Sequence, residues 1–297
     1  MDTGAEYVLR QQIIEQLAEQ VAKKGALTRD ELTAFKVGAD SHKLIDRNKG
    51  IWNPKDLLAT LSIMSKPDSP YTDEQVGDSL LAYDYRDGNP RGDNVKLRRA
   101  LELQLPIILL RWIKDGVYIP VAPVYVIRDD FERKRFILAL DESLREVADP
   151  LHLKPIERSY AQRVTKQRLH QPEFRGRVLL AYGYRCAACG LAYPSLLDGA
   201  HIIADSDDDG SADVDNGLSL CKIHHAAYDA NLLGISPDHV IHIGPNLMHD
   251  PTDSPMLRHG LQDLDGKRIT LPRLRADYPA EDRLERRFGE FQAATGA

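Results

Sequence analysis

Two short pairs of metal-binding residues constrain the second half of this 297-residue chain more than any other feature. Cys186 and Cys189 form one pair, and Cys221 and His224 form another after 31 intervening residues. Two residues lie between the members of each pair, a spacing that suits a tight turn directing both ligands at one ion, and this ligand set is typical of tetrahedral zinc. Four protein ligands leave no open coordination position. We therefore predict a structural zinc ion whose binding contributes to folding, with three unrelated buried thiols as the alternative.

The composition is that of a globular protein, with 42% hydrophobic and 28% charged residues and no block of one charge sign. At about 100 to 200 residues per domain, this length predicts two domains or one large one. The chain has no apolar run long enough to span a membrane, and no signal-peptide pattern at its start. An odd, small number of cysteines does not indicate a disulfide framework. We therefore expect a cytoplasmic protein with no membrane partner.

The net charge of −6 hides an uneven distribution of charged side chains. Residues 151–185 carry eight basic and two acidic side chains, whereas residues 186–297 carry nine and eighteen. A basic band in an acidic molecule indicates contacts with nucleic-acid phosphates, and a solvated linker helix is the alternative. The candidate phosphate contacts are Arg163, Lys166, Arg168, Arg175 and Arg177.

Hydrophobic periodicity and turn signals divide the chain into two halves. They predict helices over 7–24, 91–103, 175–182 and 281–293, and strands over 107–112, 117–127 and 136–140. We expect the last helix to pack against its own domain, with pairing to a second subunit as the alternative. The result is an α+β protein. Its predicted parts are a β-rich domain over 1–150, a basic linker over 151–173, and a second domain over 174–297 with a C-terminal helical extension.

Between the two ligand pairs lie a histidine and an asparagine, and a second histidine follows at the start of a predicted helix. His201 ends an apolar strand, Asn216 comes 15 positions later, and His225 comes 9 positions after that. Together with the ligand pairs, this order closely resembles an HNH nuclease. That family is the zinc-stapled form of the ββα-metal fold, in which two strands and a helix hold one divalent ion against the scissile phosphate. The resemblance covers about residues 174–240.

The resemblance implies a role for each of the three residues. His201 would be the general base that deprotonates the attacking water. Asn216 would hold the catalytic loop and orient His201, and His225 would bind Mg²⁺ or a similar divalent ion. Phosphodiester hydrolysis needs a base with a pKa near neutrality and a cation that stabilises the developing charge, so these residue types suit the reaction.

One position departs from the family pattern. Many members carry Asp or His immediately before the general base as a metal ligand, whereas this chain has Ala200. Asp229 lies four residues after His225 on the same helix face and is our preferred second ligand; Asp198 is the other candidate. We expect the cluster Asp205, Asp207, Asp208 and Asp209 to be a solvated loop, with a metal site as the alternative.

The order of short segments in the first half resembles the SRA-type reader of modified cytosine. That fold is a curved sheet related to the PUA barrel, and it holds a flipped base in an aromatic pocket. The matching segments are 83–88, 93–94, 97–101, 106–111 and 116–126, within about residues 60–141. A reader followed by an HNH module is the layout of prokaryotic modification-dependent restriction endonucleases, which the whole chain resembles.

A flipped base needs an aromatic stack, a partner for its edge and contacts that hold the strand open. The candidates for this pocket are Tyr83, Asp84, Tyr85 and Asn94. Packing in the domain core is the alternative for each of them. Neighbouring strand positions face opposite sides of a sheet, so Asp84 can join the tyrosines only where the strand ends or bulges.

We therefore predict an endonuclease of restriction type, in which an SRA/PUA-like domain reads modified-cytosine DNA and a zinc-stapled ββα-metal (HNH) domain cuts it. The expected cofactors are structural Zn²⁺ and catalytic Mg²⁺ or a similar ion. One HNH centre cuts one strand, so we expect a homodimer on double-stranded DNA. One alternative is an HNH nicking or defence nuclease without modified-base specificity. The other is a non-catalytic, zinc-stabilised DNA-binding protein, which would need neither His201 nor Asn216.

Overall fold

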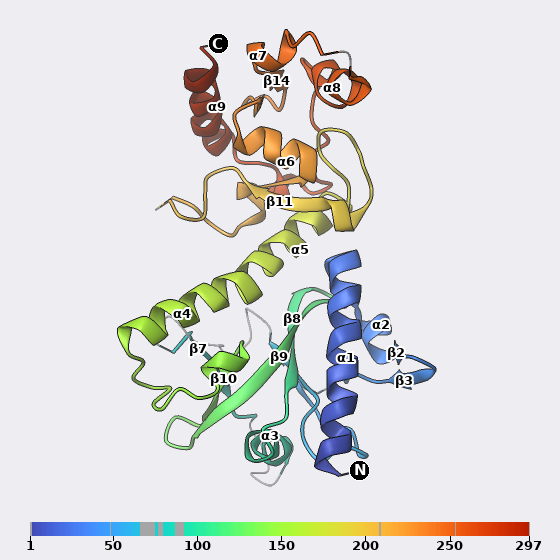
Figure 1. Ribbon diagram of the computed structural model, residues 1–297, viewed down its shortest axis with the longest axis vertical. Helices are drawn as coiled ribbons and strands as arrows, with labels where there is room; N and C mark the ends of the chain where they lie inside the picture. Colours follow the sequence, from blue (N-terminus) through green and yellow to red (C-terminus); the bar gives the residue numbers. More distant parts are fainter. Residues whose placement is uncertain are drawn as a thin grey trace. The chain divides into compact units, whose positions relative to one another are not determined.

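The computed structural model describes residues 2–47, 49–65, 75–76, 80–86, 92–207, 209–252 and 254–296. The chain divides into two compact units, Met1–Glu173 and Phe174–Ala297, whose elements are labelled in Figure 1. Each unit contains both helices and strands, so the predicted α+β class is confirmed. Within the described residues, no helix is both long and apolar enough to span a lipid bilayer.

The first unit is built around one mixed sheet. Its helices are α1 (Thr3–Lys24), α2 (Arg29–Thr33), α3 (Asp93–Glu102), α4 (Pro155–Thr165) and the start of α5 (Gln171–Ala181), with a π-helical turn over Lys166–His170 and a 3-10 turn over Glu142–Leu144. Its strands are β1 (Leu27–Thr28), β2 (Phe35–Val37), β3 (Asp40–His42), β4 (Ile51–Trp52), β5 (Ser62–Ser65), β6 (Gln75–Val76), β7 (Leu80–Asp84), β8 (Ile107–Lys114), β9 (Val117–Asp130) and β10 (Arg135–Ala139).

The long strand β9 organises this sheet. The strand order is β4-β5-β8-β9-β10-β7-β6, and β1 also pairs with β9. Only β5 and β8 run parallel among these described pairs. The β8–β9 hairpin turns at Gly116, whose φ of 74° is a conformation that glycine adopts without strain. The runs of β-branched and aromatic residues that predicted these strands fill two apolar clusters of the unit.

Helix α1 is fastened to the sheet by a buried ion pair. Arg10 contacts Glu6 at 2.7 Å, and their side chains are 1% and 0% exposed. The Arg10 guanidinium also donates to the carbonyl oxygens of Thr60 at 2.8 Å and Pro106 at 2.6 Å. Because every charged atom has a partner, the pair holds the helix at the start of β8 without leaving a charge unpaired.

Residues 151–173, predicted as a basic linker, are mostly helical and belong to the first unit. Ala161, Val164 and Leu169 are buried in its larger apolar cluster. Arg168 donates to the backbone carbonyl oxygens of Leu140 and Ala122. Apolar residues at helical spacing, hidden among the basic ones, explain why the segment packs against the sheet.

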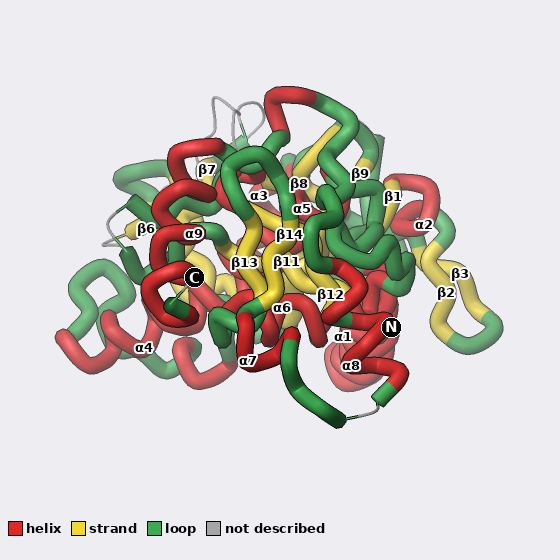
Figure 2. Tube along the Cα trace, turned by 90° about the horizontal axis from the view of Figure 1, so that it is seen from above, coloured by secondary structure: helices red, strands yellow, loops and turns green. Residues whose placement is uncertain are grey.

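The second unit consists of two short hairpins surrounded by helices, and Figure 2 shows β11 beside β12 and β13 beside β14. Its strands are β11 (Leu197–His201), β12 (Gly217–Cys221), β13 (Leu233–Ile235) and β14 (Ile241–Ile243). Its helices are the rest of α5, α6 (Lys222–Asp229), α7 (Pro245–Met248), α8 (Pro255–Gly260) and α9 (Glu281–Thr295), with 3-10 turns over Pro194–Leu196, Val214–Asn216, Gln262–Leu264 and Arg275–Asp277. Helix α6 follows β12 directly, which gives the ββα order.

Helix α9 packs within its own unit, as the sequence analysis preferred. Leu284 and Phe291 are 0% and 2% exposed, while Phe288 is half-buried. The ring of Phe291 lies over Gly234 in β13, where a Cβ atom would stand 2.6 Å from the ring. A larger residue at position 234 would therefore push the helix away from the hairpin.

Candidate active site and metal centre

The four predicted zinc ligands come together as one cluster. Their ligand atoms all lie within 4.8 Å of one another. Nδ1 of His224 is 3.4 Å from Sγ of Cys186 and 3.1 Å from Sγ of Cys221. In a tetrahedral zinc site, S and N ligands lie about 3.6 Å apart, given Zn–S and Zn–N bonds near 2.3 and 2.05 Å. The donor set and its geometry therefore fit a tetrahedral metal ion.

A backbone contact sets the tautomer of His224. Its Nε2 lies 2.7 Å from the carbonyl oxygen of Gly260. A carbonyl only accepts hydrogen bonds, so Nε2 carries the proton and Nδ1 presents its lone pair to the sulfur atoms. Such an outer hydrogen bond is the usual way in which proteins orient a metal-binding histidine.

His201 is held at the end of β11 by close packing. Its ring stacks on the ring of Phe174, with centroids 3.8 Å apart and an interplanar angle of 11°. His201 pairs with Gly217 across the hairpin. A Cβ atom at Gly217 would stand 2.4 Å from Val178 and 3.0 Å from Phe174. Glycine at this position therefore allows α5 to approach the hairpin and support the histidine ring.

Asn216 ties down the backbone that follows His201. Its Oδ1 accepts a hydrogen bond from the Ile203 amide at 2.9 Å, and its Nδ2 donates to the Ile203 carbonyl at 3.0 Å. The same Nδ2 donates to the Ser211 carbonyl at 2.8 Å. The side chain is completely buried. Asn216 thus joins both ends of the loop between the two strands.

His225, on helix α6, lies between the carboxylates of Asp198 in β11 and Asp229 in α6. Its Nδ1 is 3.3 Å from Asp198, and its Nε2 is 3.3 Å from Asp229. The hydrogen bond with Asp198, helped by the Asp229 charge, raises the pKa of His225. The hydrogen bonds with His225 and then Lys222 lower the pKa of Asp198 to about 2. Asp198 therefore stays charged and keeps the His225 ring oriented toward Asp229.

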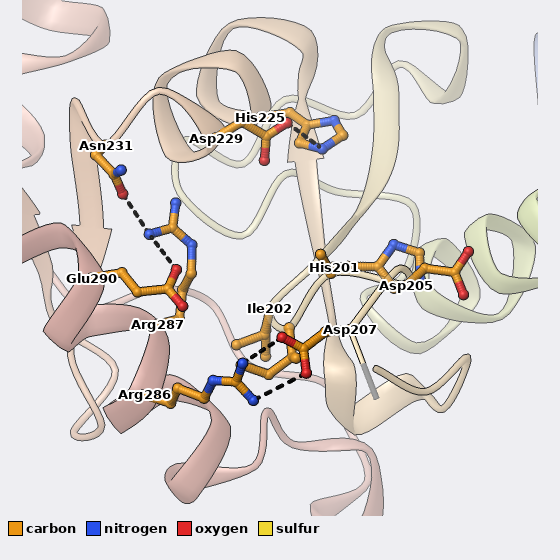
Figure 3. Close-up of a pocket in the computed structure, with 12 residues that line it drawn as sticks. His201, Ile202, Asp205, Asp207, His225, Asp229, Asn231, Arg286, Arg287 and Glu290 are labelled. Atoms are coloured by element: carbon orange, nitrogen blue, oxygen red, sulfur yellow. Dashed lines mark hydrogen bonds and ion pairs between the residues drawn. The ribbon is translucent and has the colours of Figure 1, made fainter. Parts of the chain in front are cut away.

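A pocket of about 470 Å³ brings these residues together, and Figure 3 shows His201, His225 and Asp229 on its wall. Asp229 lines this pocket, whereas Asp198 is not among the lining residues and instead contacts Lys222 at 2.6 Å. Of the two candidate second ligands, Asp229 therefore shares the pocket with His201. The pocket combines two imidazoles and a carboxylate in one solvent-accessible hollow.

The acidic loop between the hairpin strands is not simply solvated. Asp205 and Asp207 line the pocket. Asp207 and Asp209 form ion pairs with Arg286 at 2.5 and 3.0 Å. Asp208 lies outside the described residues. The sequence did not reveal these ion pairs, because α9, which carries Arg286, lies far along the chain from the aspartates.

Several side chains of the predicted basic band contact other groups of their own unit. Arg168 and Arg175 use their guanidinium groups on backbone carbonyls, and Arg175 donates to Leu197 and Pro194 at 3.0 and 2.5 Å. Arg163 lies over the Tyr160 ring at 5.1 Å. Lys166 and Arg177 are half-buried and also have partners. The structure therefore assigns structural contacts to most of the predicted phosphate ligands.

Within the described residues, the candidate base-pocket residues Tyr83, Tyr85 and Asn94 contact other groups of the first unit. Tyr83 is 3% exposed and packs in the core of the first unit. Asn94 is also buried and bonds both backbone groups of Arg86. The Tyr85 hydroxyl bonds Asp129, and burial together with this hydrogen bond raises the pKa of Tyr85 to about 12.

Asp84 is half-buried at the end of β7, where it pairs with Arg135 across the sheet. The adjoining residues 87–91, which include part of the segment that resembles the reader, lie outside the described residues. For Tyr83 and Asn94 the structure therefore favours the packing alternative, because both side chains are buried.

The sequence analysis missed four residues of the pocket wall. Asn231 follows α6, and Arg286, Arg287 and Glu290 come from α9. Arg287 donates to the Tyr228 carbonyl and to Asn231, each at 2.5 Å. The sequence feature that could have indicated these residues is the pair Arg286 and Arg287, next to the apolar face of the predicted helix over 281–293. Their partners could not be identified from the sequence because they lie 56 to 79 positions earlier in the chain.

Comparison with known proteins finds one matching family and several similar solved structures. The model of the family described as HNH endonuclease matches residues 186–236. No curated protein sequence matches the chain. Among solved structures, the modification-dependent TagI restriction endonuclease is similar at 16% identity and a TM-score of 0.32, over 89% of this chain and 90% of that one.

Two further structures are similar to parts of the chain. The SUVH5 SRA domain in complex with hemimethylated CG DNA has 22% identity and a TM-score of 0.27, over 38% of this chain and 81% of that one. The type IV phosphorothioation-dependent restriction endonuclease ScoMcrA has 13% identity and a TM-score of 0.24, over 85% and 53%. The family match agrees with what the ligand pairs and the His, Asn, His order indicated: residues 186–236 are similar to the HNH endonuclease family.

Proposed function

We propose that this protein is a DNA endonuclease of restriction type whose active site is the pocket of the second unit. The observation that carries the proposal is the shared pocket of His201, His225 and Asp229, in a segment that matches the HNH endonuclease family. These groups supply the base and the cation-binding side chains that phosphodiester hydrolysis requires.

In this proposal His201 is the general base. Its imidazole takes a proton from water as the water oxygen bonds to phosphorus. The bond from phosphorus to the 3′ oxygen then breaks, and that oxygen takes a proton from solvent, which leaves a 3′-hydroxyl and a 5′-phosphate. Phe174 holds the ring by stacking, and Asn216 is a positioning residue that holds the backbone directly after His201.

His225 and Asp229 would hold a divalent ion such as Mg²⁺. When bound, that ion stabilises negative charge on the phosphate oxygens. Asp198 accepts the Nδ1 proton of His225, which leaves the Nε2 lone pair directed toward Asp229 and the pocket. The Cys186, Cys189, Cys221 and His224 cluster would hold Zn²⁺ as a closed structural site.

The finer part of the proposal concerns the substrate. We propose that the first unit directs cleavage to double-stranded DNA with modified cytosine, because the order of segments over residues 60–141 resembles the SRA-type reader. A homodimer would place two HNH centres on the two strands.

Cleavage of supercoiled plasmid tests the enzyme class. The parent chain with Mg²⁺ should convert plasmid to nicked or linear DNA, and chelation of divalent ions should stop the reaction. The substrate test uses one plasmid prepared unmodified, 5-methylated, 5-hydroxymethylated and phosphorothioated. Equal cleavage of all four would replace the modified-base reader with the nicking or defence nuclease. Binding without any cleavage would leave the non-catalytic DNA-binding protein.

A further inference from the structure

Helix α9 places an arginine directly at the candidate active site. Arg286 lines the pocket with His201 and His225, although it lies 50 residues beyond the segment that matches the family. Figure 3 shows its side chain extending from α9 to Asp207. Its Nη1 and Nη2 atoms contact Asp209 at 3.0 Å and Asp207 at 2.5 Å. Asp207 also accepts a hydrogen bond from Nη1 at 3.3 Å, so this carboxylate bonds both Nη atoms of the guanidinium group.

The neighbouring arginine has a different environment. The side chain of Arg287 is 11% exposed. It donates to Tyr228 and Asn231, and its guanidinium lies over the Tyr228 ring at 4.6 Å. These contacts fix α9 to the end of α6, so Arg287 is structural. Arg286, in contrast, is 43% exposed, and its side chain forms ion pairs with the two aspartates of the loop.

The partners of Arg286 are chemically similar to a DNA phosphate. A carboxylate and a phosphate both present paired oxygens to the planar fork of a guanidinium group. Asp209 is 80% exposed, and exposed ion pairs are weak because water screens them. A phosphate that enters the pocket can therefore replace the aspartates at little cost.

We propose that Arg286 is a phosphate-binding residue of the active site, and that Asp207 and Asp209 occupy it until DNA arrives. This inference rests on the proposed nuclease function and adds to it the residue that grips the substrate backbone. It also explains how an acidic unit accepts DNA, since most arginines of the basic band are engaged with backbone carbonyls or an aromatic ring. The two aspartates compete with DNA, so they lower its affinity.

The proposal predicts opposite effects for the two sides of the ion pair. Binding is measured with the full chain carrying His201→Ala, on a duplex with 5-methylcytosine and on its unmodified counterpart, over a series of salt concentrations. Arg286→Ala should weaken binding by about tenfold and reduce the slope of log affinity against log salt by about 1, the contribution of one phosphate contact. Asp207→Asn with Asp209→Asn should strengthen binding.

A double-mutant cycle separates release of Arg286 from a general effect of charge. If the aspartates act through Arg286, their replacement strengthens binding in the presence of Arg286 and has a much smaller effect when Arg286→Ala is also present. Arg283→Ala is the matched control. Arg283 bonds Ser211 and Asp215 of the same loop but does not line the pocket, so its removal should leave the salt slope unchanged.

The outcomes distinguish this inference from the proposed function. An unchanged salt slope for Arg286→Ala, or an equal gain from the aspartate variants in both backgrounds, would overturn the inference while plasmid cleavage by the parent chain upholds the nuclease. If the ion pair only stabilised the fold, the arginine variant and the aspartate variant would both lower DNA affinity or thermal stability. That result would also overturn the inference. If the parent chain neither binds nor cuts DNA, both ideas fail.

Discussion

The two units of the protein reach stability in different ways. The first has a sheet with a 14-residue strand, two apolar clusters and a buried ion pair. The second relies on hairpins of five and three residues per strand, with one apolar cluster and a Cys₃His group. Isolated short hairpins are marginally stable in water, so a metal cross-link is an effective substitute for a larger sheet.

The Cys₃His cluster and the candidate active site share one helix. His224 and His225 are neighbours at the start of α6, where successive residues point about 100° apart. One imidazole therefore faces the buried cysteines, and the next faces the pocket. Loss of the Cys₃His cluster should therefore remove both the fold and the proposed activity of the second unit. Damage to the first unit should leave the candidate active site intact.

The largest expected effect comes from breaking the metal cluster. Cys186→Ser with Cys221→Ser should abolish zinc binding and unfold the second unit, because the binding free energy of structural zinc, about 10 to 16 kcal/mol in small zinc domains, becomes folding free energy. Elemental analysis should find about one zinc per chain in the parent. Calorimetry should show that only one of two transitions is lost. Unchanged melting in the variant would reject the structural role.

His201→Ala should lower the cleavage rate by about 10² to 10⁴-fold, the usual contribution of a general base. Zinc content, thermal stability and DNA affinity should remain close to those of the parent, since the ring contacts Phe174 at the pocket wall and is not in the Cys₃His group. Single-turnover cleavage of plasmid measures the effect. Cleavage near the parent rate would exclude His201 as the base.

Glu6→Gln tests the stability of the first unit. It removes the negative charge beside buried Arg10 and should cost about 3 to 5 kcal/mol of unfolding free energy. Glu19→Gln is the control on the same helix, because Glu19 pairs with Lys23 in solvent and should change stability by less than about 1 kcal/mol. Denaturant titration measures both. Equal losses of unfolding free energy in the two variants would contradict the importance of burial. Both variants should still nick plasmid at low temperature.

Asp198→Asn should weaken divalent-ion activation by about 10 to 100-fold, the usual cost of losing a group that orients a metal-binding histidine. The Mg²⁺ concentration needed for half-maximal cleavage is the readout, and zinc content should not change. Asp250→Asn in the same unit is a control, because Asp250 bonds Thr252 and does not line the pocket. An identical Mg²⁺ dependence for Asp198→Asn and the parent would show that Asp198 does not act through His225.

The smallest effect is expected for recognition by the first unit expressed alone. The fragment should span residues 1–173, because Ala161, Val164 and Leu169 complete its core. It should bind a modified-cytosine duplex more tightly than the unmodified duplex, with total affinity below that of the full chain, since base contacts specify and phosphate contacts strengthen binding. Titration of matched duplexes at fixed salt decides it: equal affinities would reject the reader.

Local sequence patterns determined the features that depend on a few neighbouring residues. The ligand pairs at Cys186 and Cys221 each lie in one turn, so local spacing predicted each pair as metal ligands. The helix over 281–293 is α9, and the strands over 107–112 and 117–127 are the central hairpin. These elements follow from hydrophobic period and turn residues, which act over one or two turns of chain.

Tertiary packing decided everything that joins distant segments. It buried Tyr83 and Asn94, directed Arg168 and Arg175 to backbone carbonyls, and chose Asp229 over Asp198 for the pocket. It also brought Arg286 to Asp207, 79 positions away. The sequence pattern around a charged or aromatic residue is the same whether its side chain faces solvent, the core or a ligand. Its surroundings are set by the free energy of packing the whole unit, which sequence spacing does not reveal.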